Sequence, residues 1–205
     1  MIKHHPTFEL LQSFVNGDLP ASLSAGIAIH ADMCEKCQSH IAQLTDQVAE
    51  ANFEFEEVFL DRFIVDESKD LDEVALMSFE DMIDGITASN DVDTIAEKQE
   101  KYIEFNEQMY AIPTALHSMS LGKTANIGKL SRTRVQLDEN EIHTSLLHIE
   151  PGGGVPEHTH KGFELTLLLD GSFEDEKGTY VKGDFIMLDG SHQHHPISSQ
   201  GCLCY

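Results

Sequence analysis

The sequence lacks the long apolar segments that mark membrane and exported proteins. None of its apolar runs approaches the roughly 18 residues that a helix needs to cross a bilayer. The N-terminal stretch, from Met1 to Pro6, has no apolar core of the kind that a signal peptide carries. We therefore expect a soluble protein of the cytoplasm with no membrane contact.

Cysteine is also scarce, and its placement argues against a disulfide scaffold. The 205 residues contain four cysteines in two close pairs, Cys34/Cys37 and Cys202/Cys204. Small secreted proteins that depend on disulfides are much shorter. In a reducing compartment, the first pair is interpreted as metal ligands or a redox switch. The second pair is either two buried strand residues or an oxidisable pair.

Positive charge is the third shortage. The chain has 13 Lys and Arg against 36 Asp and Glu, a net charge of -23. Residues 1–110 hold 24 acidic and 6 basic side chains (net -18), whereas residues 111–205 hold 12 and 7 (net -5). This field repels nucleic acid, so no direct binding of DNA or RNA is expected, and it favours a basic protein partner. Ordinary solubility is the alternative explanation.

The first half of the chain has helical apolar spacing. A short helix is predicted from Phe8 to Val15, ended by Asn16-Gly17, and a second begins at Leu19-Pro20. A long helix after the cysteines and a further helical stretch each carry one apolar face: Ile41, Leu44, Val48, Ala51, Phe55 and Val58, then Leu71, Val74, Ala75, Phe79, Met82 and Ile83. These faces form the core of a bundle or, in part, contact a partner.

The character changes after Pro113, where glycine becomes frequent and short apolar runs recur about every ten residues. This pattern is typical of an antiparallel sandwich or barrel. The predicted fold class is α+β in two separate domains. An all-α helical bundle spans residues 1–95, a linker with a helical segment spans 96–111, and an all-β domain spans 112–205.

A histidine cluster opens the second half. On an extended strand, His158 and His160 point to the same side, and Glu164 keeps that parity. Two imidazoles and a carboxylate can bind a divalent metal such as Zn, Fe, Mn or Ni.

The surrounding pattern resembles the cupin family, whose members are small β-barrels built as a double-stranded β-helix. The first cupin motif is matched by Gly152, His158, His160, Glu164 and Gly171. In the second motif, Gly183, Asp184 and His194 fit, while Asp189, Ser191 and Ser198 replace the usual proline, glycine and asparagine. The resemblance implies His194 as the fourth ligand. His192 and His195 remain rivals, since parity does not separate His192 from His194.

A second cluster lies in the stretch HADMCEKC. His30, Cys34 and Cys37 are spaced i, i+4, i+7, which places them on one helix face or lets them converge across a helix break. Thiolates with imidazoles suit zinc, and a tetrahedral zinc site needs a fourth ligand. His4 and His5, just before the first helix, are the candidates.

The whole chain resembles the ChrR-type anti-sigma factors, which join a zinc-binding helical domain to a cupin domain. The resemblance rests on a histidine pair at the N-terminus, His30-x3-Cys34-x2-Cys37, the cupin motifs and a closing Cys-x-Cys. It implies that His5, His30, Cys34 and Cys37 hold zinc. It also implies a second divalent metal, expected to be zinc, in the cupin domain.

The function that follows from the resemblance is regulation of transcription, not catalysis. Such a protein binds an extracytoplasmic-function sigma factor, keeps it from RNA polymerase, and releases it under oxidative stress such as singlet oxygen, with the cupin domain needed for the response. One alternative is a metal-dependent cupin dioxygenase or isomerase with a helical dimerisation arm, which would need open coordination positions. Another is a thiol redox switch at Cys34 and Cys37.

Overall fold

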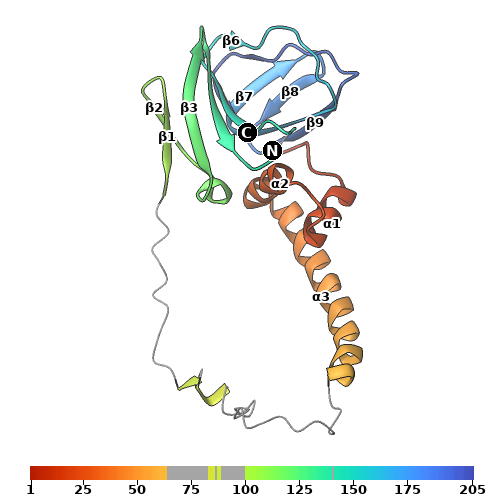
Figure 1. Cartoon of the computed structure of the whole chain (residues 1–205). Coiled ribbons are helices and arrows are strands. Elements are labelled where there is room, and N and C mark those ends of the chain that lie inside the picture. Colours follow the sequence, from red (N-terminus) through yellow and green to blue (C-terminus); the bar gives the residue numbers. More distant parts are fainter. Residues whose placement is uncertain (64–82, 86, 89–99, 140) are drawn as a thin grey trace. The chain divides into compact units, whose positions relative to one another are not determined.

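The computed structural model describes residues 1–63, 83–85, 87–88, 100–139 and 141–205 (Figure 1). The chain divides into two compact units, residues 1–50 together with 100–205, and residues 51–99. The predicted apolar face from Leu71 to Met82 lies outside the described residues. The predicted domain limits at residues 95 and 111 stay a prediction.

Among residues 1–63, which the structure describes, the chain forms three helices, as the apolar spacing predicts. Helix α1 (Phe8–Asn16) begins at Thr7, whose hydroxyl accepts a hydrogen bond from the Leu10 amide, and ends at Gly17 with φ +76°. Helix α2 (Ala21–Met33) follows Pro20, and helix α3 (Glu35–Phe63) begins after a break at Cys34, whose backbone is extended. In the first part of α3 the apolar residues at positions 41, 44 and 48 are partly or fully buried, which confirms the predicted face.

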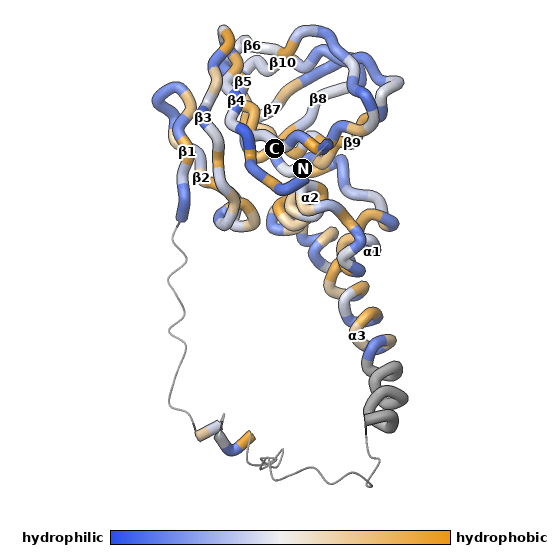
Figure 2. The backbone as a smooth tube through the Cα atoms, viewed as in Figure 1, coloured by the Kyte–Doolittle hydropathy of each residue, from blue (hydrophilic) through white to orange (hydrophobic). Residues whose placement is uncertain are grey.

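The C-terminal part is a curled antiparallel sheet, which confirms the predicted all-β architecture. After the short 3-10 helix η1 (Thr114–Leu116), its strands are β3 (Ser120–Ile127), β4 (Leu130–Gln136), β5 (Ser145–Ile149), β6 (Gly153–Gly154), β7 (Phe163–Asp175), β8 (Gly178–Val181), β9 (Phe185–Asp189), β10 (Ile197–Ser198) and β11 (Cys202–Cys204). Figure 2 shows apolar and polar residues interleaved along these strands, as a sheet with one buried face requires.

Strand β7 organises the sheet because several strands pair with it. Its first half, Phe163–Leu167, pairs with β9, and its second half, Ser172–Asp175, pairs with β8. Strand β11 lies antiparallel to both β5 and the middle of β7. The cysteines Cys202 and Cys204 of β11 are buried, which favours their interpretation as core residues over an exposed redox pair.

Residues 102–111 form a hairpin of β1 (Tyr102–Phe105) and β2 (Gln108–Ala111), so the predicted helical segment is wrong here. The turn residues Asn106 and Glu107 have positive φ angles of 48° and 67°, as a two-residue hairpin turn needs. Phe105 and Tyr110 pack their rings against His148 of β5. Burial of these aromatic rings on the sheet outweighs the weak helical pattern.

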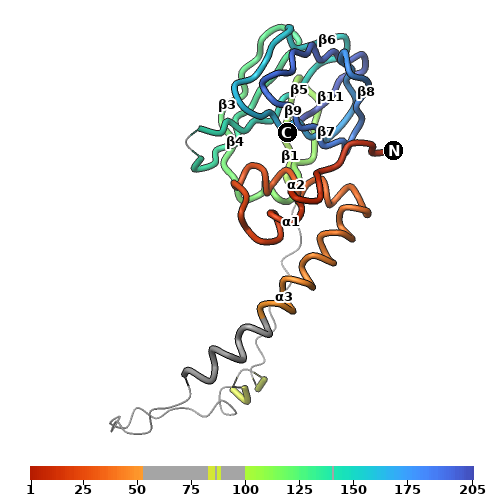
Figure 3. Tube along the Cα trace, turned by 90° about the vertical axis from the view of Figure 1, so that its right-hand side faces the viewer, coloured from red at the N-terminus to blue at the C-terminus, as the bar shows by residue number. Residues whose placement is uncertain are grey.

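The helices and the sheet share a core within the first unit (Figure 3). One cluster of buried residues contains Leu11 and Ile27 of the helices together with Leu167, Phe185 and Leu203 of the sheet. At Gly26 of α2, a Cβ atom would lie 2.7 Å from the end of the Leu165 side chain, so α2 packs closely on β7 at this point. The Tyr205 hydroxyl donates a hydrogen bond to the Ser22 carbonyl at 2.8 Å.

Within the described ranges, no helix is both long enough and apolar enough to cross a membrane.

Candidate metal centres

Four potential ligands converge in the helical part, from four different places. His5 lies in the extended segment before α1, His30 in the last turn of α2, Cys34 at the helix break and Cys37 in the first turn of α3. One ligand atom from each lies within 4.8 Å of the other three. The break at Cys34 turns the chain so that α2 and α3 both face the centre. Of the two geometries considered from the sequence, the structure adopts the broken helix.

The separations within this group match a tetrahedral site. The His5 Nδ1 atom lies 3.4 Å from His30 Nε2, 3.4 Å from the Cys34 sulfur and 3.5 Å from the Cys37 sulfur. The His30 Nε2 atom lies 3.3 Å from the Cys37 sulfur. Zinc bond lengths to nitrogen and sulfur place the ligand atoms of a tetrahedron about 3.3 to 3.8 Å apart. The donor set and its spacing therefore fit zinc.

Burial makes this centre unfavourable for free charges. His30 is fully buried, and burial lowers its pKa, although a hydrogen bond to the Gly183 carbonyl opposes this. Burial, followed by the charge of Lys36, also lowers the pKa of His5. Burial, with a contact to Cys34, raises the pKa of Cys37 to about 11. The imidazoles are thus ready to coordinate, whereas the Cys37 thiol must lose a proton to a metal.

The tautomer of His30 is fixed from outside the helical part. Its Nδ1 atom lies 2.7 Å from the carbonyl oxygen of Gly183, in the turn between β8 and β9. A carbonyl can only accept, so Nδ1 carries the proton and Nε2 presents its lone pair to the centre.

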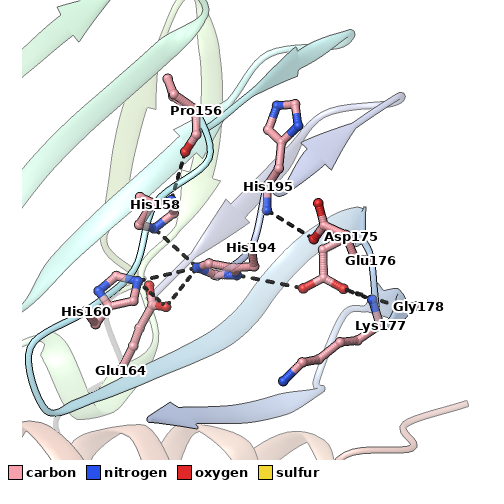
Figure 4. Close-up of polar contacts among 10 residues, drawn as sticks. All are labelled: Pro156, His158, His160, Glu164, Asp175, Glu176, Lys177, Gly178, His194 and His195. Atoms are coloured by element: carbon pink, nitrogen blue, oxygen red, sulfur yellow. Dashed lines mark hydrogen bonds and ion pairs between the residues drawn. The ribbon is translucent and has the colours of Figure 1, made fainter. Parts of the chain in front are cut away.

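A second group gathers in the sheet (Figure 4). Glu164 stands in β7, His158 and His160 precede that strand, and His194 lies between β9 and β10. An isolated bridge pairs His158 with His194, and this register brings the two chain segments together. The cupin resemblance had implied these four residues, and the structure brings all of them to one place.

The polar atoms of this group also lie at ligand distances. The His194 Nε2 atom is 3.2 Å from His158 Nε2, 3.3 Å from His160 Nε2 and 3.2 Å from the Glu164 Oε2 oxygen. His160 Nε2 is 2.7 Å from the same oxygen. This buried oxygen therefore faces the imidazole nitrogens of the group, as expected for a ligand atom directed at a cation.

Of the three histidines of the second motif, the structure places His194 in the group. His194 is buried within the group, and burial is the largest cause of its lowered pKa. His192 instead lies with its Nδ1 atom 2.8 Å from Asp189, and Figure 4 shows the His195 ring turned away from the group. Behind His194, an Asp175 carboxylate oxygen lies 3.7 Å from Nδ1, which is longer than a hydrogen bond.

Sequence reasoning missed the partners that support each group. Asp175, Gly183 and Asp184 contact ligand residues or the chain beside them, but they are far from those residues in the sequence. In the sequence, Gly183 and Asp184 were notable only because they match the second cupin motif. No sequence signal connects them with the helical centre.

Comparison with known proteins agrees with this architecture. Residues 117–205 match the family described as the ChrR cupin-like domain. The chain is 26% identical over 213 aligned positions to the anti-sigma-E factor ChrR of Cereibacter sphaeroides, covering 99% of this chain and 88% of that protein. It also resembles a chain in the crystal structure of Rhodobacter sphaeroides SigE in complex with the anti-sigma ChrR, with a TM-score of 0.66, 24% identity, and coverage of 100% of this chain and 97% of that one. The structural match supports the fold.

Proposed function

We propose that the chain is an anti-sigma factor of the ChrR type, which binds an extracytoplasmic-function sigma factor in the cytoplasm and keeps it from RNA polymerase. The observation that carries the proposal is the convergence of His5, His30, Cys34 and Cys37 in a chain that resembles ChrR over 99% of its length. The protein acts by sequestering a protein partner, not by catalysis and not by contacting DNA.

Zinc is the metal that best suits the helical centre. Two thiolates with two imidazoles are soft and borderline ligands, which favour zinc over calcium or magnesium. Zinc bound there would clamp the N-terminal segment, α2 and α3 together. In small domains such a site contributes on the order of 10 kcal/mol to folding. The clamp would fix the helical surface that the sigma factor recognises.

The second centre, at His158, His160, Glu164 and His194, would hold another zinc ion. Four protein ligands complete a tetrahedral shell, which is typical of structural zinc, whereas catalytic zinc keeps a position open. This argues for a structural or sensory role and against a cupin enzyme. In the proposed function, the cupin part is needed to release the sigma factor under oxidative stress.

Charge supports a basic protein partner. Residues 1–110 carry a net charge of -18, and a sigma factor has basic promoter-binding surfaces that such a field attracts. Complementary charge speeds encounter, while apolar contacts supply most of the affinity.

The proposal is tested by co-expressing the chain with the extracytoplasmic-function sigma factors of its own genome, followed by affinity capture and metal analysis. We expect one sigma factor to be captured with two zinc ions per chain. Cys34→Ala or Cys37→Ala should lose one zinc and the sigma factor together. His40→Ala should lose neither, because His40 lies near Cys37 in α3 but outside the four-ligand group.

Other results would contradict the proposal. Capture of no sigma factor by the zinc-loaded chain would remove the anti-sigma role. A single redox metal per chain, with oxygen consumption in the presence of small organic acids or thiols, would instead identify a cupin enzyme.

A further inference from the structure

The turn between β8 and β9 belongs to the cupin sheet, yet it lies against the helical metal centre. Its Gly183 carbonyl accepts the hydrogen bond from His30 Nδ1 at 2.7 Å. The next residue but one, Phe185, places its ring edge-on to the His30 imidazole, with centroids 5.8 Å apart. The orientation of one ligand ring is therefore set by the sheet.

The same turn holds the segment that carries a second ligand. Asp184 is fully buried, and its Oδ1 oxygen accepts hydrogen bonds from the backbone amides of Lys3 at 2.7 Å and His4 at 3.0 Å. The Phe185 amide donates to the His4 carbonyl at 3.0 Å. The Asp184 Oδ2 oxygen accepts from the Val181 amide at 2.9 Å, which anchors the carboxylate in its own turn. His5 follows directly after this anchored pair.

The close approach depends on glycine at position 183. Its φ of +91° is a conformation that L side chains rarely adopt, and an added Cβ atom would lie 2.5 Å from the Ile2 side chain. The positive φ therefore favours glycine at this position, and the N-terminal segment packs closely against the turn.

We propose that the Gly183-Asp184 turn of the cupin part positions two of the four ligands of the helical metal centre, His30 directly and His5 through the Lys3-His4 backbone, so that metal retention there depends on the sheet. This inference rests on the proposed metal site. Partners that orient metal ligands from outside the coordination shell typically affect metal affinity 10- to 100-fold.

Strand β9 connects the Gly183-Asp184 turn with the second metal group. Strand β9 starts at the turn and runs along β7, where Leu188 pairs with Glu164, a member of the second metal group. One short strand therefore lies between the two centres. A change at the cupin centre that shifts β9 would also move the Gly183 carbonyl, which accepts from His30, and the Asp184 carboxylate, which holds the N-terminal segment.

Cobalt(II) makes the test specific for the helical centre. Of the two metal groups found among the described residues, the helical one alone contains cysteine, so cobalt bound there is the source expected for a thiolate-to-cobalt charge-transfer absorption in the near ultraviolet. We expect the full chain with Asp184→Asn to bind this cobalt about tenfold more weakly than the unchanged chain in competition with a chelator. The metal content of the cupin centre should not change. Asp138→Asn, at an exposed carboxylate of the same part, is the matched control and should have no effect.

A second pair of variants leaves the sheet untouched, in case Asp184→Asn impairs folding. Lys3→Pro removes one amide donor to Asp184, whereas Lys3→Ala keeps it. Lys3→Pro should weaken cobalt binding at the helical centre by ~3-fold or more, as expected when at least part of the energy of one hydrogen bond to a charged acceptor contributes to holding His5, and Lys3→Ala should not.

The measurements distinguish failure of the metal site from failure of the positioning role of the turn. If the unchanged chain shows no thiolate-to-cobalt absorption, the proposed metal site itself is wrong. If the absorption appears but Lys3→Pro binds cobalt as tightly as Lys3→Ala, the positioning role of the turn is overturned while the site stands.

Discussion

At the residue scale, the acid–base state of the ligands determines how the helical centre takes up a metal. Burial lowers the pKa values of His5 and His30, so both imidazoles are already neutral near pH 7. The Cys37 thiol, with a pKa of about 11 in the metal-free protein, is protonated there. Binding of zinc or cobalt must therefore release the Cys37 proton.

We expect metal affinity at the helical centre to rise with pH. Below a pKa of about 11, release of the Cys37 proton alone makes the association constant increase about tenfold for each pH unit, so the total increase should be at least tenfold. Because both histidines are neutral above pH 7, they should not contribute to the slope between about pH 7 and 9. Competition titrations with cobalt at several pH values, followed by the thiolate absorption, measure this slope. A flat profile would show that the Cys37 sulfur is not a ligand.

The two candidate ligand groups could be proposed from the sequence because the patterns that suggest them are local. His30, Cys34 and Cys37 are close in sequence, and the cupin spacing located His158, His160 and Glu164. The choice of His194 over His192 needed the pairing of His158 with His194, since residues two apart on a strand point the same way. The roles of Gly183 and Asp184 could not be predicted, because they depend on how the helices dock on the sheet.

At the element scale, the β1–β2 hairpin shows where local pattern fails. Its sequence is charged and moderately amphipathic, which led to a predicted helix. The conformation is set by contacts with the sheet. The Phe105 ring stacks on the His148 ring with centroids 5.4 Å apart, and the Tyr110 ring packs against the same His148 ring with centroids 5.3 Å apart. Tertiary packing of this kind overrides weak propensity. The more regular apolar patterns of α1 and of the first part of α3 were predicted correctly.

Phe105→Ala should destabilise the first unit by about 3 kcal/mol, the usual cost of removing a buried aromatic ring. The Phe105 side chain is 1% exposed and contacts both Tyr110 and His148. Met109→Ala, on the same hairpin but 57% exposed, is the matched control and should cost less than about 0.5 kcal/mol. Urea unfolding monitored by tyrosine fluorescence, with zinc held constant, gives both values. Equal effects of the two variants would mean that the hairpin does not pack on the sheet in solution.

At the scale of the whole molecule, charge and packing divide the chain differently. By charge, the division falls near residue 110, with a net of -18 before it and -5 after it. By packing, α1, α2 and the start of α3 form one compact unit with the sheet, through a core that includes Ile27 and Phe185. The apolar periodicity of the sequence predicted that one half is helical and the other is β-sheet. It could not predict that the two share a core, because docking depends on how two surfaces fit together and leaves no periodic pattern in the sequence.

The charge distribution leads to the last prediction, which concerns association with the sigma factor. Attraction between an acidic and a basic surface acts before contact, so it raises the association rate and is screened by salt, whereas buried contacts set the dissociation rate. Raising the salt concentration from 50 to 500 mM shortens the Debye length from about 14 to about 4 Å. We expect the association rate constant to fall at least about tenfold over this range and the dissociation rate constant to change by less than about threefold. Stopped-flow mixing of the zinc-loaded chain with a fluorescently labelled sigma factor measures both. An association rate independent of salt would mean that the acidity of residues 1–110 serves solubility and does not steer the partner.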